Sequence, residues 1–172
     1  KKYSKAAQLN LFEALGQGTE ELSLQPSPEE STHLLLKFYE LWKEDTSGFH
    51  LEPFVSIIRS MFSRNNNICE YSANSCSKII HVDVFGQYRF CSRAPFENKF
   101  ILGTVDETPI SELKKKGSLL EDRLKTIKTD CEYFDICNCG CPLTNQNINV
   151  LLNYCSARKA LFKKIEDDIY EN

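Results

Sequence analysis

The sequence predicts an α+β fold, in which a small β-hairpin and cysteine-rich loops are flanked by helices. Apolar residues recur at helical spacing near both ends of the chain, and they alternate with polar residues over a short stretch in the middle. All eight cysteines lie between Cys69 and Cys155. This uneven distribution predicts two units, residues 1–66 without thiols and residues 67–172 with all of them.

The front unit is expected to hold two helices after a short extended or irregular segment, Leu9 to Leu15. Ser27-Pro28-Glu29-Glu30 predicts the first helix, with Ser as N-cap, Pro at the first position and Glu at the third. Its apolar face would carry Leu34, Leu35, Phe38, Leu41 and Trp42. Pro53 opens the second helix, whose apolar residues are Phe54, Ile57, Ile58, Met61 and Phe62.

The rear unit begins with a predicted hairpin. Ile80, Val82 and Val84 alternate with polar residues, and the pattern resumes at Tyr88 and Phe90. Between the two runs, Gly86 supplies the positive φ that a tight turn requires.

Three further helices are expected in the rear unit. Pro109 starts a short one that runs through Lys116 and ends at Gly117. Ser118-Leu119-Leu120-Glu121 is a capping box for another, ending near Lys128, and a long helix from about Val150 to Tyr170 closes the chain.

Composition excludes several function classes. The formal charge is −3, which does not favour binding to a nucleic-acid backbone, and no apolar run is long enough for a membrane helix. The N-terminal residues lack a signal-peptide core and an initiator methionine, so we expect a cytoplasmic chain that is part of a longer gene product. Clustered cysteines in such a compartment usually bind metal, whereas a disulfide framework would require export.

The cysteine spacing favours iron–sulfur clusters. Eight thiolates match two 4Fe–4S clusters at four ligands each. Cys131, Cys137, Cys139 and Cys141 lie so close in sequence that one zinc ion would be cramped, although a zinc-binding structural module remains the alternative. Asn138 and Gly140 tolerate left-handed backbone and would let this loop wrap around a metal centre.

The other cysteines flank the hairpin and the last helix. Cys76 precedes the turn glycine by ten positions and Cys91 follows it by five, so the hairpin would bring both to one end. Cys69 lies seven residues before Cys76, and Cys155 would attach the last helix to a cluster.

The pattern C-x9-G-x4-C, then C-x5-C-x3-C, then a distant cysteine resembles the SPASM domain of radical SAM enzymes, which mature peptides and proteins. The accompanying segments Ile80–Asp83, Leu102–Val105, Gly140–Pro142 and Leu152–Cys155 are also similar. Among SPASM proteins, the chain looks most like maturases that form cyclophane or related crosslinks in ribosomal peptides. The resemblance implies cysteine-rich loops around two metal clusters, preceded by the end of a partial (β/α) barrel.

The resemblance also implies ligand sets. The first auxiliary cluster would take Cys69, Cys76, Cys91 and Cys141, and the second would take Cys131, Cys137 and Cys155. The fourth ligand of the second cluster should lie where this chain has Lys128, a poor ligand. Cys139 stands where the family usually has glycine, and it is expected to replace that ligand. An open iron site is the rival, and Cys139 and Cys141 could exchange clusters.

Two departures bear on mechanism. Sulfatase-maturing relatives carry a basic aspartate directly after the third ligand of the first cluster, where this chain has Ser92, so sulfatase-type maturation is disfavoured. Arg93 follows, either in a surface salt bridge or steering an acidic substrate group.

The motif C-x3-C-x2-C, which binds the cluster that cleaves S-adenosylmethionine, is absent. The chain alone should therefore be inactive. The resemblance implies an upstream radical SAM core with S-adenosylmethionine and a third cluster, a peptide or protein substrate, and an electron donor such as ferredoxin or flavodoxin.

Overall fold

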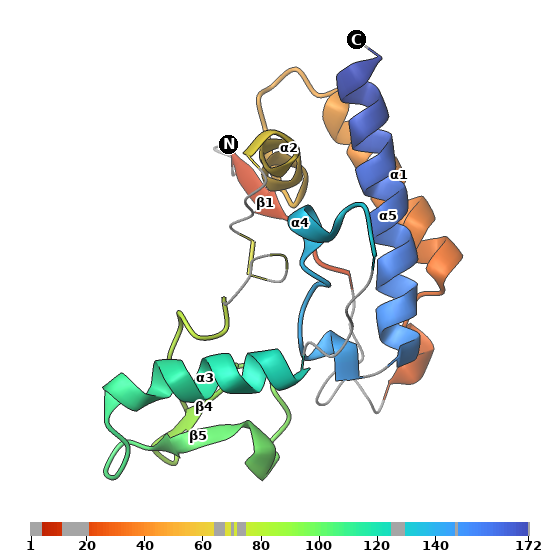
Figure 1. Ribbon diagram of the computed structural model, residues 1–172. Coiled ribbons are helices and arrows are strands. Elements are labelled where there is room, and N and C mark those ends of the chain that lie inside the picture. Colours follow the sequence, from red (N-terminus) through yellow and green to blue (C-terminus); the bar gives the residue numbers. More distant parts are fainter. Residues whose placement is uncertain are drawn as a thin grey trace.

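The computed structural model describes residues 5–11, 21–63, 68–69, 71, 75–124, 130–146 and 148–171. Helices and two small sheets make up these residues, which confirms the mixed α+β class. Figure 1 shows a helical part with a two-stranded sheet above a smaller part in which one helix covers a three-stranded sheet. The segments that carry cysteines run between the two parts.

A parallel strand pair opens the helical part. Strand β1 (Ala6–Gln8) pairs with β2 (His50–Glu52), with Ala6 opposite His50 and Gln8 opposite Glu52. Between them the chain passes through a 3₁₀ turn, η2 (Leu22–Leu24), and helix α1 (Pro28–Lys43), as parallel pairing requires a crossover. The predicted partial barrel is not among the described elements, and it stays a prediction.

Helix α1 begins as the sequence predicts. The Ser27 hydroxyl accepts a hydrogen bond from the Glu30 backbone N–H at 3.1 Å, and the Glu30 carboxylate accepts one from the Ser27 N–H at 2.8 Å. Such a cap satisfies N–H groups that have no partner inside the helix and contributes about 1 kcal/mol.

The long helix α5 (Ile148–Tyr170) packs along α1, and α2 (Phe54–Ser63) lies across them (Figure 1). Their apolar faces form the larger core, where Tyr39 and Trp42 of α1 stack with Phe54 at centroid distances of 5.5 and 5.7 Å. The fully buried members include Phe54, Ile57, Ile136, Leu161, Phe162 and Ile165. Both predicted helices of the front unit, and the last helix, are therefore confirmed.

The smaller part contains the predicted hairpin. Strands β3 (His81–Val82) and β4 (Gln87–Arg89) pair antiparallel, and Gly86 in the turn has a φ of 72°. A third strand that was not predicted, β5 (Ile101–Thr104), follows the short turn η3 (Asn98–Phe100) and pairs with β4. A smaller core gathers here around Phe90, Phe100 and Leu143.

Helix α3 (Ile110–Leu124) corrects the prediction of two helices separated at Gly117. Gly117 lies buried inside one continuous helix, where a Cβ would stand 3.5 Å from the Ser77 Cα. Close packing on the Ser77 backbone thus outweighs the roughly 1 kcal/mol by which glycine disfavours a helix interior. The predicted end near Lys128 lies outside the described residues.

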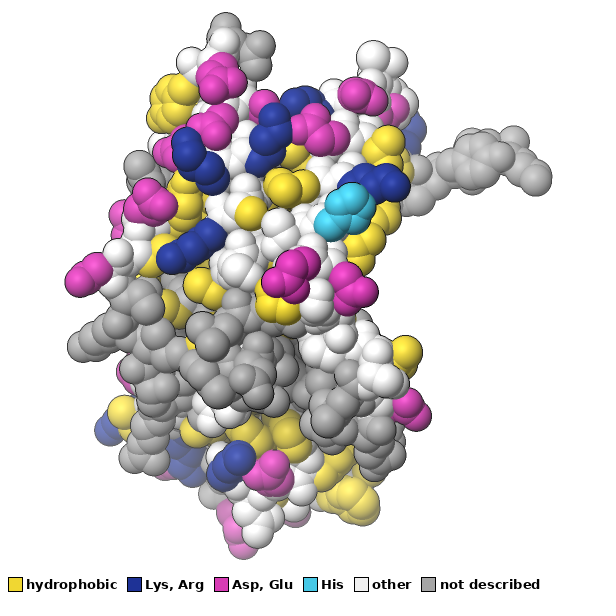
Figure 2. Space-filling model, turned by 90° about the vertical axis from the view of Figure 1, so that its right-hand side faces the viewer, with side chains coloured by type: hydrophobic (Ala, Val, Ile, Leu, Met, Phe, Trp, Pro, Cys, Tyr) yellow, Lys and Arg dark blue, Asp and Glu magenta, His cyan; other side chains and the backbone are white. Residues whose placement is uncertain are grey.

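The surface of the helical part is mixed in charge. Figure 2 shows lysine, arginine, aspartate and glutamate side chains interspersed over it, without a continuous field of one sign. None of the helices in the described ranges is both long enough and apolar enough to cross a membrane.

Candidate functional site

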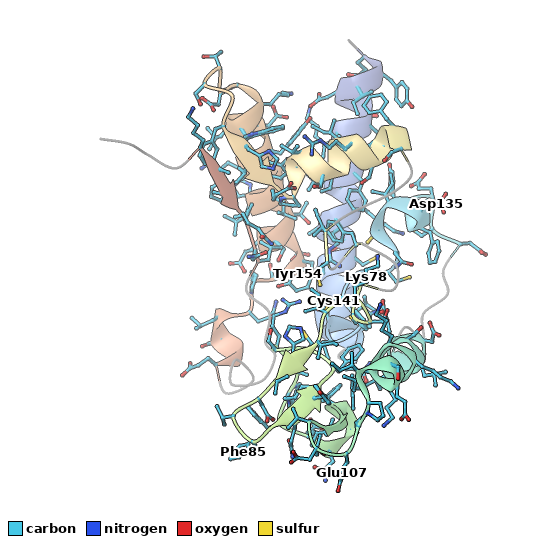
Figure 3. The ribbon with its side chains drawn as sticks, turned by 90° about the vertical axis from the view of Figure 1, so that its left-hand side faces the viewer. Lys78, Phe85, Glu107, Asp135, Cys141 and Tyr154 are labelled. Atoms are coloured by element: carbon cyan, nitrogen blue, oxygen red, sulfur yellow. The ribbon has the colours of Figure 1, made fainter. Side chains whose placement is uncertain are left out.

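Four cysteines from four separate segments lie around the smaller core. Cys141 is 5% exposed and belongs to this core, and half-buried Cys76 and Cys91 pack against it. Cys69, which follows α2, is exposed. In Figure 3, Cys141 lies in the middle of the molecule, between the helices and the small sheet, with other sulfur atoms beside it.

The neighbours of the Cys76 thiol act on its ionisation. Burial, followed by the Glu121 carboxylate and the thiols of Cys141, Cys69 and Cys91, raises the pKa of the Cys76 thiol to about 12. Like charges near one another disfavour ionisation in this way. Thiolates held near one another repel, and a bound cation or cluster that neutralises them relieves that repulsion.

Backbone and side-chain donors point at two of these sulfur atoms. The Arg93 backbone N–H donates to Cys91 Sγ at 3.5 Å, and the Arg93 guanidinium Nη2 donates to Cys141 Sγ at 3.4 Å. N–H donors of this kind commonly surround the sulfurs of iron–sulfur sites and tune their potential. Arg93 was predicted to form a surface salt bridge or to steer an acidic substrate group. Neither role included a contact with a ligand sulfur.

The predicted second set lies at the larger core. Cys131 and Cys137 are half-buried and pack against that core; Cys131 precedes the short helix α4 (Phe134–Cys137), and Cys137 is its last residue. The Cys131 carbonyl accepts the Phe134 N–H at 3.0 Å, which closes the turn into α4. The cysteine-rich loop therefore starts at the helical part and ends, at Cys141, in the smaller core.

Three consecutive residues reverse the chain after α4. Asn138, Cys139 and Gly140 have φ angles of 48°, 61° and 75°, all in the left-handed region. The Asn138 N–H donates to the Phe134 carbonyl at 2.7 Å, and the Gly140 N–H donates to the Cys137 carbonyl at 2.8 Å. The left-handed backbone expected at Asn138 and Gly140 is present and includes Cys139. That the loop wraps around a metal centre stays a prediction.

Cys155 is half-buried on α5, in its second turn and one residue after buried Tyr154. Lys128, the position of the missing ligand, lies outside the described residues. Within the described residues, no three Cys, His, Asp or Glu side chains converge as the ligands of one metal ion. All eight predicted ligands are described and carry thiols that form no disulfide with one another, so the donor set suits iron–sulfur clusters.

Two buried charges near the cysteine-bearing segments were not predicted from the sequence. Glu121 is 1% exposed, and its Oε2 accepts the Cys76 backbone N–H at 3.2 Å. Arg158 is 3% exposed, with its guanidinium 4.9 Å from the Tyr71 ring and 5.3 Å from the Tyr154 ring. Both were missed because charged side chains on a helix are exposed in most proteins.

A cavity of about 690 Å³ opens beside the first cysteine set. It lies where β1 and β2 end, and Cys69 and Arg93 form part of its wall. Ligands of parallel β/α structures commonly bind at the carboxyl ends of the strands. The remaining wall residues are Gln8, Leu9, Asn10, Glu52, Pro53, Ser56, Arg59 and Ile68.

Comparison with solved structures identifies the fold. Native anSMEcpe with bound AdoMet superposes with a TM-score of 0.66 and 16% identity, over 84% of this chain and 43% of that chain. The same protein with bound AdoMet and a Cp18Cys peptide superposes with a TM-score of 0.65 and 15% identity, over 96% of this chain and 50% of that one. The chain thus spans about half the length of these structures. They represent an anaerobic sulfatase-maturating enzyme, a SPASM-domain radical SAM enzyme. No protein-family model matches the chain, and no curated protein does.

Proposed function

We propose that this chain is the auxiliary-cluster region of a radical SAM enzyme that modifies a ribosomally made peptide or protein. Its fold, shared with about half of an AdoMet-binding enzyme that takes a peptide, supports this proposal. Residues 1–66 would form the tail of the radical SAM partial barrel and a linker, and residues 67–172 the SPASM unit. The crosslink-forming maturases remain the proposed subclass. Sulfatase-type maturation is disfavoured, because Ser92 stands where those enzymes have an aspartate that acts as a base.

One observation carries the proposal: Cys76 and Cys91 pack against a core that contains Cys141, and Arg93 donates to the sulfurs of Cys91 and Cys141. These three cysteines come from three segments up to 65 positions apart, counting from Cys76 to Cys141. A set assembled by folding, partly buried and supplied with N–H donors, suits the first 4Fe–4S cluster.

The second cluster would be held by Cys131, Cys137, Cys139 and Cys155. The backbone of Cys139 supports its inclusion. A non-glycine residue in the left-handed region costs about 1 kcal/mol, which glycine would avoid. Strain that a simple substitution would relieve points to a role for the side chain.

Bound clusters of this type store and pass single electrons. The protein would hold each cluster through its cysteine sulfurs, and the two apolar cores would shield the clusters from water. A peptide segment would bind in the cavity beside Cys69. The proposed partners are an upstream core with S-adenosylmethionine and a third cluster, and a ferredoxin or flavodoxin as electron donor. We place the protein in the cytoplasm, where thiols stay reduced.

Anaerobic purification followed by iron, sulfide and zinc analysis tests the proposal. We expect about eight iron and eight sulfide per chain, since each cluster holds four of both. Stoichiometric zinc with negligible sulfide, in protein never exposed to air, would contradict it and favour the zinc-binding structural module.

Two substitutions at one position test the role of Cys139. If its thiol is a ligand, Cys139→Ser and Cys139→Gly both reduce iron and sulfide by up to half and change the spectrum of the second cluster. If it only occupies a strained position, Cys139→Gly leaves the metal content unchanged and raises the free energy of unfolding by about 1 kcal/mol. Cys76→Ser serves as the matched control, because it should affect the first cluster alone.

A further inference from the structure

We propose that Arg93 and Glu121 set the reduction potential of the first cluster by placing opposite charges next to different ligands. The inference rests on the proposed function, since it concerns the cluster held by Cys69, Cys76, Cys91 and Cys141. It assigns to two residues of this chain a role in tuning that cluster and not in binding it.

Arg93 contacts the ligand set on one side. Its backbone N–H and its guanidinium donate to the sulfur atoms of two different ligands, Cys91 and Cys141, at 3.5 and 3.4 Å. Reduction adds negative charge that spreads onto the ligand sulfurs, and a cationic donor stabilises it. Arg93 therefore raises the potential, favouring the reduced cluster.

Glu121 carries the opposite charge and should have the opposite effect on the potential. Helix α3 brings its side chain into the protein, where it is 1% exposed and accepts the Cys76 backbone N–H at 3.2 Å. Its carboxylate therefore lies against the backbone of one ligand residue, where its negative charge opposes extra negative charge on the cluster. Water screens a buried charge poorly. Glu121 therefore lowers the potential, favouring the oxidised cluster.

The two residues reach the site from different elements. Arg93 follows the β3–β4 hairpin, and Glu121 lies on α3, which packs against β5. Each contacts a different ligand residue, so each can be neutralised without removing a ligand. Their effects should then be opposite in sign and should largely cancel when both are removed.

EPR-monitored redox titration of the reconstituted chain tests the proposal. The relevant signal is the one that Cys76→Ser abolishes. We expect Arg93→Gln to lower the midpoint potential and Glu121→Gln to raise it, each by a tenfold change in the oxidised-to-reduced ratio, which is about 59 mV for one electron. The double variant should return close to the wild-type value.

Two controls separate local charge from general effects. Lys99→Gln removes an exposed positive charge from the smaller part of the chain, and Glu112→Gln removes an exposed negative charge from the same helix as Glu121. Neither variant should move the potential measurably. If Glu121→Gln does not retain its cluster, the potential of Arg93→Gln, compared with that of Lys99→Gln, tests the inference by itself.

The failure of this inference is distinct from the failure of the proposed function. Full iron and sulfide content with unchanged potentials in both variants, or shifts of the same sign, would overturn the inference alone. A chain without sulfide would overturn the proposed function, and this inference with it.

Discussion

At the scale of single residues, the conformation of the loop after α4 is the least expected feature. Left-handed backbone at Asn138 and Gly140 follows from their side chains, because Asn and Gly adopt it at low cost. Cys139 between them has the same conformation without that advantage. The neighbouring residues, which reverse the chain within a few positions, hold it in that conformation.

Gly140 offers a residue-scale prediction. A Cβ at this position would overlap Nη1 of Arg158, whose guanidinium is held between the rings of Tyr71 and Tyr154. Gly140→Ala should therefore lower the free energy of unfolding by about 1 kcal/mol for the left-handed backbone and by a further ~1–3 kcal/mol for displacing Arg158. Urea denaturation of the wild type and the variant, followed by circular dichroism, measures the total loss.

Gly48→Ala is the matched control for that substitution. Gly48 has nearly the same φ, 73° against 75°, but a Cβ there meets nothing within 4 Å. Its cost should stay near 1 kcal/mol. Equal losses in the two variants would show that Arg158 yields freely and is not held by the rings.

At the scale of elements, a charged cluster joins the two longest helices in addition to their apolar contact. Asp168 of α5 is 15% exposed, and it accepts hydrogen bonds from Lys43 of α1 at 2.9 Å and from Lys164 at 2.8 Å. Hydrogen bonds from Lys164, Lys43 and Tyr39 lower the pKa of Asp168 from 3.8 to about 2. The carboxylate therefore contributes to stability when it is ionised.

The sign of that shift predicts a pH dependence. A lowered pKa in the folded state means that the contribution is present at neutral pH and is lost as the pH falls through 3.8 towards 2. Asp168→Asn should cost about 1 kcal/mol at pH 7, and the difference from wild type should vanish near pH 2. Denaturation of the metal-free chain at several pH values measures this.

Asp167→Asn provides the comparison on the same helix. Asp167 pairs with Lys163, and because both residues lie in α5, this pair does not join two elements. The Asp167 side chain is also more exposed, at 38%. Exposed pairs of this kind contribute a few tenths of a kcal/mol. A loss at Asp167 as large as that at Asp168 would contradict the assigned role of the α1–α5 contact.

At the scale of the whole molecule, two apolar cores lie on either side of the cysteine-bearing segments. The larger core takes most of its buried side chains from α1, α2 and α5, and Cys131 and Cys137 pack only against its margin. The smaller core includes Cys141 itself and is flanked by Cys76 and Cys91. In the smaller part, Phe85 of the hairpin turn is exposed and lies at the far end from Cys141 (Figure 3).

Metal removal should therefore affect the two parts unequally. Chelation of the reconstituted chain is expected to speed hydrogen exchange around Cys76, Cys91 and Cys141 by at least tenfold, because four thiols are left without the group that holds them together. Backbone amides of α1 and α2, which carry no proposed ligand, should keep their protection. Hydrogen exchange with mass spectrometry, before and after chelation, measures both, and equal loss in the two parts would contradict this division.

Much of the fold could be predicted from the sequence, because the signals were local. Ser27 and Glu30 form the predicted capping box, Pro53 precedes α2, and Gly86 turns the hairpin. Each depends on neighbouring residues or on a periodic apolar face, which a short stretch of sequence contains. The ligand sets were implied by the resemblance to the SPASM domain, and they remain to be tested by metal analysis.

The tertiary structure alone decided what depends on residues far apart in the chain. It made α3 one helix across Gly117, because the Ser77 backbone packs there, and it added β5 to the hairpin. It also buried Glu121 beside Cys76 and directed Arg93 at Cys141. A helical sequence does not reveal which of its charged residues faces inward, since that depends on the segment packed against it. The sequence therefore determined which residues could bind metal, and folding decided which charges surround them.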